Sequence, residues 1–225
     1  LELLKRDDID VNQPNKKGIT PLFRAISRKQ TDIALKLLQR DDITPSINQA
    51  NHDGNTPLLL AIEKEQTDIA TALLKLDKID VNQADNDGYT PLLHAIYEKQ
   101  TDIVLKLLEH PSISDSINHP NKYGINPLLA AIDEKQTDIV LKLLEHPNIS
   151  ESINQANKNE ITPLLLAIHN QQTDIVLKLL ENPSISDSIN QPDKDGWTPL
   201  LTSISEEETD ITLKLLKRDD IGPSI

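Results

Sequence analysis

The six histidines are the side chains of this chain best suited to binding a metal ion, and they stand at positions 52, 94, 110, 119, 146 and 169. A protein zinc site needs three or four converging ligands. No two of these histidines have the spacing of ligands on one helix, and the chain contains no cysteine. His110 and His146 follow Leu-Leu pairs at expected helix C-termini, where the helix dipole accounts for them. The sequence therefore predicts no metal and no other cofactor.

Nucleophilic catalysis is equally disfavoured by the sequence. Serine and aspartate are plentiful but recur with a fixed period, so a Ser/His/Asp constellation would have to form on a repeating, solvated edge. Five of the six glycines occupy equivalent turn positions, which leaves none for a glycine-rich phosphate loop. The sequence predicts no catalytic residue and a protein that is not an enzyme.

Aromatic residues are rare, and the tyrosines and the tryptophan lie outside the repeating apolar pattern. The chain has three Tyr, one Trp and one Phe. Large amphipathic rings supply much of the binding energy in protein interfaces. Partner binding is the chemistry that these side chains favour. The alternative is that the rings shield the apolar base of neighbouring turns, because isolated exposed aromatics are common on protein surfaces.

A repeated phrase must position these side chains. It runs from a turn with Gly through Thr-Pro-Leu or Asn-Pro-Leu, a short apolar run and Gln-Thr-Asp-Ile to a closing Leu-Leu. Its prolines lie 36, 34, 36, 36 and 36 residues apart, at Pro21, Pro57, Pro91, Pro127, Pro163 and Pro199. A fixed period of this length indicates stacked supersecondary units, each burying its apolar face against its neighbours.

Each unit is predicted to hold two helices. Thr20 can cap a short helix that begins at Pro21, because proline lacks only a donor that would be unsatisfied at that position. A second helix is expected to begin at Thr31, with the threonine hydroxyl as its cap and the Asp32 charge at the positive end of its dipole. Its buried stripe is expected to comprise Ile33, Leu37 and Leu38.

Two helices, a projecting Asn/Asp/Gly turn and a Thr-Pro-Leu cap at this period resemble the ankyrin repeat. The resemblance covers essentially the whole chain and implies an all-α solenoid of stacked helix-turn-helix units with projecting hairpin-like turns. We expect a single array over residues 1–225, and a fragment of a longer chain, because residues 1–5 match the end of a second helix. The expected segments are 1–13 as the end of a truncated repeat, then 14–49, 50–83, 84–119, 120–155, 156–191 and 192–225.

Several departures from the family pattern carry structural expectations. The position between the helices, usually Gly, holds Lys, Glu or Gln here, and a left-handed backbone there costs about 1 kcal/mol per residue. Glu160 replaces a turn glycine and predicts either a distorted hairpin or a strained backbone. Two extra residues in four of the connections are expected on the surface, away from the core. The last repeat drifts toward polar residues, which suggests a polar cap, although we expect the chain to continue beyond it.

The resemblance also implies a function. In the ankyrin family the concave face and the hairpin tips contact partner proteins, so a non-catalytic protein-binding module is expected. The alternatives are the recruiting arm of a larger enzyme or effector whose catalytic domain lies outside this chain, and a spacer without a partner. The predicted contact residues are those that do not recur near the turns: His52, Asp53, Tyr89, His94, Tyr97, Glu98 and Tyr123, with Trp197 beyond them.

The net charge of the chain limits the classes of partner that it is expected to bind. The formal net charge is −13, whereas nucleic-acid binding requires a basic surface. No apolar stretch approaches the roughly 18 residues of a membrane span. We therefore expect a monomer that binds a protein with a basic surface, and neither nucleic acid nor a membrane. The acidic groups that would steer such a partner are Asp53, Glu63, Asp87, Glu98, Asp133 and Glu134.

The expected location follows from composition and from likeness of style. The lack of cysteine fits a reducing intracellular compartment. Residues 101–118 and 173–190 differ only at His110 and Asn182, which indicates tandem duplication. An Asn-, Lys- and Ile-rich sequence with such duplications resembles ankyrin proteins of intracellular bacteria that act on host proteins. The resemblance implies the cytoplasm, or the host cytoplasm for a secreted effector.

Overall fold

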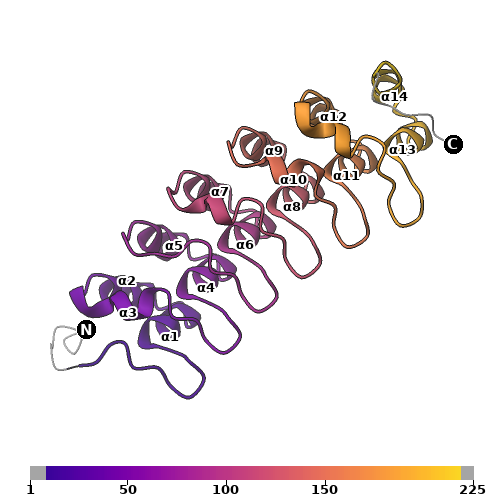
Figure 1. Ribbon diagram of the computed structural model, residues 1–225. Helices are drawn as coiled ribbons and strands as arrows, with labels where there is room; N and C mark the ends of the chain where they lie inside the picture. The colour runs from indigo at the N-terminus through magenta and orange to yellow at the C-terminus, as the bar shows by residue number, and fades with distance from the viewer. Residues whose placement is uncertain (1–8, 219–225) are drawn as a thin grey trace. The chain divides into compact units, whose positions relative to one another are not determined.

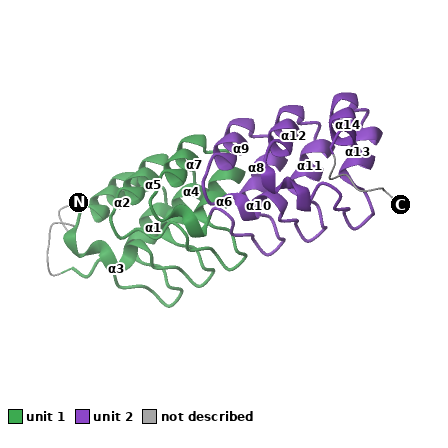
Figure 2. Cartoon of the chain, turned by 45° about the horizontal axis from the view of Figure 1, so that its top comes forward, with its two compact units in different colours: residues 1–116 green, residues 117–225 purple. Residues whose placement is uncertain are grey.

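The computed structural model describes residues 9–218, which form short paired helices and no strand (Figure 1). Residues 1–8 and 219–225 lie outside the described part, and with them the predicted helix end at residues 1–5 and the end of the last connection. The chain divides into two compact units, residues 1–116 and 117–225 (Figure 2). The predicted array of six repeats with those boundaries stays a prediction.

The first helix of each pair begins at the proline of the repeated phrase, as predicted. The residue before it, Thr or Asn, accepts a hydrogen bond through its side-chain oxygen from the backbone N–H three residues later, at 2.9–3.3 Å. The helices are α1 (Pro21–Ser27), α4 (Pro57–Glu63), α6 (Pro91–Tyr97), α8 (Pro127–Asp133), α11 (Pro163–His169) and α13 (Pro199–Ser205).

The second helix of each pair begins at the predicted Thr, but the predicted capping hydroxyl is wrong. Thr31 is already the first helical residue, and the preceding Gln30 makes no side-chain cap. Ile33 is only half-buried, because no described second helix precedes it, whereas Leu37 and Leu38 are buried as predicted. The helices are α2 (Thr31–Leu38), α5 (Thr67–Leu74), α7 (Thr101–Leu108), α9 (Thr137–Leu144), α12 (Thr173–Leu180) and α14 (Thr209–Leu216).

The link between paired helices adopts the left-handed conformation that the family pattern implied. The residues with this backbone are Lys29, Glu65, Lys99, Lys135, Gln171 and Glu207, with φ of 53°, 55°, 52°, 54°, 55° and 59°. Glu160 has a φ of 62°, and its backbone N–H still donates to the Asn157 carbonyl at 2.9 Å, the bond that closes the other hairpins. The strained backbone is therefore the correct alternative, and the distorted hairpin is wrong.

Within each unit, first helices pack on first helices and second helices on second helices. In one unit α1, α4 and α6 form one layer and α2, α5 and α7 the other; in the second unit α8, α11 and α13 lie beside α9, α12 and α14. The core between the layers is built from Leu, Ile, Val and Ala, with Phe23 as the one phenylalanine. Within each unit the hairpins project beside the first helices, away from the second helices (Figure 1).

The glutamine that precedes each second helix joins neighbouring repeats. The side-chain amide of Gln66 donates to the Ile26 carbonyl at 2.8 Å, and that of Gln100 donates to the Ile62 carbonyl at 2.6 Å. In the second unit Gln172 makes the same bond to Ile132 at 2.6 Å. Each bond is a second one to a carbonyl at the end of the first helix of the preceding repeat, which also accepts from the backbone N–H of the left-handed link, as Ile26 does from Lys29 at 2.9 Å. The recurrence of this glutamine is thus a packing requirement.

Asparagine and serine join the connections in a second set of bonds. The Asn82 amide donates to the Ser112 carbonyl at 2.6 Å, while its side-chain oxygen accepts from the Ser116 hydroxyl at 2.7 Å. Where the next connection is short and lacks the serine, Asn48 accepts instead from the backbone N–H of Asp80 at 2.9 Å. The serines of the longer connections are buried: Ser46, Ser116, Ser152 and Ser188.

In each longer connection the two residues after the buried isoleucine are exposed, as expected of the insertion, and the serine that follows them is buried. The isoleucine after that serine, such as Ile47 at 2% exposed, fills the place that Val81 fills at 0% in a short connection. The short helical turns of these connections are η2 (Asp41–Ile43), α3 (Thr44–Ile47), η3 (Ile113–Asp115), α10 (Ser150–Asn154) and η4 (Pro183–Asp187).

The outer face of α13 and α14 is apolar, so the suggested polar cap is wrong. Leu201 and Ile204 are 48% and 56% exposed, whereas their counterparts in the preceding repeat, Leu165 and Ile168, are 3% and 1% exposed. The residues keep the core type of their positions, but no described helix packs against them. Leu213 and Leu216 extend the same exposed face.

Candidate functional site

Three of the predicted contact residues meet in one cluster on the first unit. Tyr89 ends a hairpin, and His94 and Tyr97 stand on α6 three residues apart, which places them on one side of the helix. The ring centroid of Tyr89 lies 5.4 Å from that of His94 and 5.8 Å from that of Tyr97, at interplanar angles of 46° and 59°. These tilted contacts are in the favourable range for aromatic pairs. We call Tyr89, His94 and Tyr97 the Tyr cluster.

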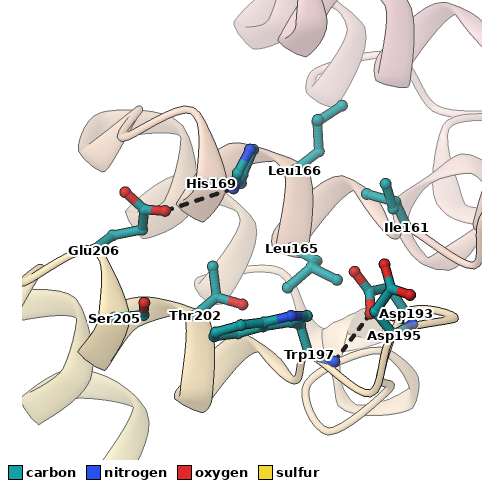
Figure 3. A pocket seen from close by; sticks show the side chains of 10 residues that line it. All are labelled: Ile161, Leu165, Leu166, His169, Asp193, Asp195, Trp197, Thr202, Ser205 and Glu206. Atoms are coloured by element: carbon teal, nitrogen blue, oxygen red, sulfur yellow. Dashed lines mark hydrogen bonds and ion pairs between the residues drawn. The ribbon is translucent and has the colours of Figure 1, made fainter.

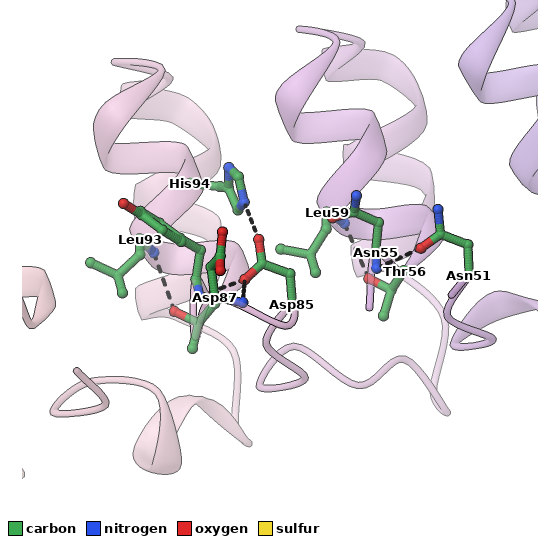
Figure 4. A network of polar contacts seen from close by, with 10 residues as sticks. Asn51, Asn55, Thr56, Leu59, Asp85, Asp87, Leu93 and His94 are labelled. Carbon is green, nitrogen blue, oxygen red and sulfur yellow. Dashed lines mark hydrogen bonds and ion pairs between the residues drawn. The ribbon is translucent and has the colours of Figure 1, made fainter. Parts of the chain in front are cut away.

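Asp85 fixes the Tyr cluster to the hairpin. One of its carboxylate oxygens accepts hydrogen bonds from the backbone N–H groups of Asp87 and Tyr89, both at 2.9 Å. The other lies 3.3 Å from Nε2 of His94 (Figure 4). The Asp85 and His94 side chains are 14% and 19% exposed, so the contact is largely shielded from water. The carboxylate therefore holds both the turn and the imidazole in place.

The Tyr cluster offers a preformed, amphipathic contact surface. Its rings are half-buried and packed on one another, so little side-chain freedom remains to be lost when a partner docks. Phenol and imidazole groups add hydrogen-bonding capacity at the edge of an apolar face. Such an arrangement suits recognition of another surface and provides no nucleophile with an adjacent base.

The other predicted residues of the first unit lie outside this cluster. His52 and Asp53 are exposed at the tip of the preceding hairpin, whose backbone is joined to the next by a bond from the Asn86 N–H to the Asp53 carbonyl at 3.4 Å. Glu98, the residue after α6, is exposed as well. These three side chains are accessible, and the backbone N–H of Glu98 donates to the His94 carbonyl at 2.9 Å.

Tyr123 and Trp197 belong to the second unit. Tyr123 is 50% exposed on a hairpin, with the Lys122 ammonium 5.2 Å from its ring centroid. Trp197 is 41% exposed and begins the approach to α13 from the last described hairpin. The single patch expected from the sequence therefore contains residues of both units, and only its Tyr cluster is assembled by contacts within one of them.

Trp197 forms a wall of a groove between α11 and α13, which we call the Trp groove. Its volume is about 390 Å³ (Figure 3). At one end Glu206 lies 3.6 Å from Nδ1 of His169 and accepts a hydrogen bond from the Gln171 amide at 3.0 Å. The lining residues are Ile161, Leu165, Leu166, His169, Asp193, Asp195, Trp197, Thr202, Ser205 and Glu206.

Sequence reasoning missed the acidic anchors of both sites. Asp85 and Asp193 stand where the other described hairpins have Asn15, Asn51, Asn121 and Asn157. Their side-chain oxygens accept the same two backbone bonds, as Asn51 does from Asp53 and Asn55 at 3.0 and 2.9 Å. The replacement of Asn by Asp in the two hairpins that carry Tyr89 and Trp197 is the signal that could have found them.

Among residues 9–218, no group of three or more His, Cys, Asp or Glu side chains is placed to hold a metal ion. Over the same residues, no helix has the length and hydropathy of a membrane span. Neither finding changes the chemistry of the two sites, which rests on aromatic rings and carboxylates.

The paired helices, left-handed links and stacked hairpins define an ankyrin-type fold, and the sequence comparison agrees. The family model for ankyrin repeats (3 copies) matches residues 1–85, 44–119, 78–153 and 148–224, so the chain belongs to the ankyrin repeat family. The predicted fold class, an all-α ankyrin-repeat solenoid, is confirmed. Ankyrin repeats are generally protein–protein interaction modules and generally non-catalytic.

Solved structures give the same fold. The ankyrin repeat protein EF0377 is 28% identical with a TM-score of 0.73, and the match covers 91% of this chain and 100% of that one. An ankyrin repeat domain from Acinetobacter baumannii AYE is 25% identical, with a TM-score of 0.70 and coverage of 87% and 96%. A chain from the complex of the Bdellovibrio bacteriovorus predatory endopeptidase Bd0816 with immunity protein Bd3460 is 21% identical, with a TM-score of 0.68 and coverage of 92% and 100%. No curated protein matches the chain.

Proposed function

We propose that this chain is a non-catalytic module that binds a partner protein through its concave face and hairpin tips. The Tyr cluster is the centre of this contact in the first unit, with Glu98 next to Tyr97 in sequence and His52 and Asp53 on the preceding hairpin as accessible polar residues. In the second unit, Tyr123 and Trp197 supply exposed aromatic surface. The chain binds this partner as a monomer.

The observation that carries the proposal is the mutual packing of Tyr89, His94 and Tyr97. Rings at the two positions of the tyrosines are not required by the fold, because the equivalent positions of the preceding repeat hold Asn55 and Glu63. The Tyr cluster is nevertheless held in place by the Asp85 carboxylate and stays half-buried at the surface. Residues that dominate the binding energy of protein interfaces are often aromatic side chains that are ordered before the partner binds.

The charge of the chain favours a partner with a basic surface. The formal net charge is −13, and acidic side chains follow the hairpins and first helices that surround the aromatic residues. Complementary charge steers encounter and selects among partners more than it adds affinity. We therefore propose that aromatic contacts supply most of the binding energy and that the carboxylates select the partner.

A capture experiment with the chain as bait tests this proposal. The Tyr89→Ala/Tyr97→Ala variant should lose most of the partner captured by the unmodified chain, because two ring contacts are removed. The matched Tyr89→Phe/Tyr97→Phe variant keeps the rings and should retain most of the capture. Partner recovery is measured by quantitative mass spectrometry at matched bait loading.

Two controls separate binding from folding. The Lys106→Ala/Glu109→Ala variant changes exposed residues at the end of α7 and should capture as the unmodified chain does. Thermal unfolding of the Tyr-to-Ala variant, followed by circular dichroism, should stay within a few degrees of the unmodified chain. Undiminished capture by that variant would contradict the proposed site, and a collapse of its stability would show that the rings serve the fold.

A further inference from the structure

We propose that the Trp groove binds the arginine side chain of a partner protein, an inference that rests on the proposed protein-binding function. The groove is formed within the second unit by α11, α13 and the hairpin from Asp193 to Trp197. Its volume of about 390 Å³ suits one long side chain and lies at the lower end of the range for ligand pockets, roughly 300–1,000 Å³.

Small side chains on α13 open this groove. Thr202 and Ser205 occupy the positions that His94 and Tyr97 occupy on α6. On α6 the two rings fill the space beside Tyr89, with ring centroids within 5.4 and 5.8 Å of it. Beside Trp197, α13 contributes no ring at these two positions, and the space is accessible. Equivalent positions of the repeat therefore hold the packed Tyr cluster beside α6 and the open Trp groove beside α13.

The walls of the Trp groove are apolar, and one buried hydroxyl in it is unpaired. Leu165 lies beside the indole of Trp197 in Figure 3, and Leu166 and Ile161 of the same preceding repeat also line the groove. Trp197 is 41% exposed. Thr202 is 5% exposed, and its Oγ1 makes no hydrogen bond within residues 9–218. A buried hydroxyl without a partner costs free energy, and a bound donor or a water carried in with it would remove that cost.

Carboxylates stand at both ends of the indole. Asp193 and Asp195 lie on one side of Trp197 and Glu206 lies on the other (Figure 3). The described lining of the groove contains no Lys or Arg, and its only other titratable residue is His169. The Asp195 carboxylate makes no hydrogen bond or ion pair with other described residues. An apolar slot with negative charge at its ends fits a side chain that is both flat and cationic.

Arginine fits this description better than lysine. The guanidinium is planar and weakly hydrated, stacks on an aromatic face, and pairs with carboxylates through parallel N–H donors. The ammonium of lysine is a compact and strongly hydrated charge, and withdrawing it from water beside the indole costs more. The three methylene groups of arginine would lie along the leucine side chains, as long charged side chains do on apolar surfaces.

The intrinsic fluorescence of the chain provides a direct test, because Trp197 is its single tryptophan. The chain is titrated with the peptide acetyl-Gly-Gly-Arg-Gly-Gly-amide and with versions carrying Lys, citrulline or Ala in place of Arg. The Arg peptide should give a saturable change in Trp197 emission. The citrulline peptide, of the same shape without the charge, should bind about tenfold more weakly or not at all.

Two variants test where the Arg peptide binds, and each introduces a residue that stands at the equivalent position of another repeat. Asp193→Asn/Asp195→Asn removes two charges but keeps the turn, because Asn157 accepts the equivalent backbone bonds at 2.8 and 3.2 Å in the hairpin before it. This variant should bind the Arg peptide about tenfold more weakly. Ser205→Tyr introduces the ring that Tyr97 places on α6 and should abolish binding. Circular dichroism melting of both variants should match that of the unmodified chain.

Several results would overturn the inference. They are the absence of a saturable change with the Arg peptide, equal binding of the Lys or citrulline peptide, and unchanged binding by the two variants. A change of Trp197 emission with protein concentration alone would show that a second copy occupies the groove. The proposed function is judged separately by capture through the Tyr cluster, so the groove can fail while the protein-binding function stands.

Discussion

Replacing Gly54 by alanine should measure how closely neighbouring hairpins stack, with Gly196→Ala as its internal control. Gly54 and Gly196 occupy the same place in their hairpins and have φ of 82° and 83°. A Cβ atom added at Gly54 would lie 2.6 Å from the backbone nitrogen and 2.7 Å from the side-chain oxygen of Asn86. A Cβ added at Gly196 would meet nothing within 4 Å.

The two free-energy costs follow from these surroundings. At both positions alanine must hold a left-handed backbone, which costs about 1 kcal/mol relative to glycine. At Gly54 the methyl group must also push the next hairpin away and lengthen the 3.4 Å bond between the Asn86 N–H and the Asp53 carbonyl. Overpacking of this kind adds about 1–3 kcal/mol. Gly54→Ala should therefore be the more destabilising substitution by about 1–3 kcal/mol.

Urea unfolding followed by circular dichroism gives the global free energy of unfolding for each variant. Because Gly196 lies in the last described hairpin, native-state exchange of the Trp197 amide reads local opening there, and exchange of the Asn86 amide reads it beside Gly54. Equal costs for the two substitutions by both methods would refute the steric reasoning. They would mean that the hairpins are free to separate at little cost.

Four further substitutions test the packing of the repeats and the backbone strain at Glu160. Ile168→Ala should destabilise the chain by about 2–5 kcal/mol and Ile204→Ala by less than about 1 kcal/mol in urea unfolding, because the two side chains are 1% and 56% exposed; similar costs would show that another surface covers Ile204. Glu208→Gln should raise the melting temperature and add about 1 kcal/mol to the free energy of unfolding, because the glutamine can donate to the Ile168 carbonyl as Gln172 donates to the Ile132 carbonyl one repeat earlier. A lower melting temperature would contradict the role given to that glutamine. Glu160→Gly should add about 0.5–1 kcal/mol to the free energy of unfolding by relieving its φ of 62°, and an unchanged value would argue against strain there.

Local features of the fold were predictable because their causes lie within a few residues of one another. The Thr-Pro-Leu phrase contains both the cap and the proline that starts each first helix, so Thr20 and Pro21 suffice to predict α1. The left-handed links followed from the resemblance to the ankyrin pattern, which usually has Gly at the position of Lys29 and its counterparts. The threonine cap of the second helix was wrong because Thr31 is already helical and Gln30 occupies the cap position without a side-chain bond.

Bonds between repeats were not predictable from the period. Gln66 and Ile26 are 40 residues apart, and Asn82 and Ser116 are 34 residues apart. Every recurring side chain repeats with nearly the same spacing, so the sequence gives no indication of which of them reaches the next repeat.

The sequence by itself determined the repeat, the start of each helix and the set of side chains that do not recur, because these depend on local caps and apolar spacing. Only the tertiary structure decided how the non-recurring side chains are used. Tyr89 meets His94 and Tyr97 in a filled cluster, whereas Trp197 stands beside Thr202 in an open groove. Stacking brings side chains of one repeat against those of the next, and their sizes, which no local pattern fixes, decide whether the space between them closes.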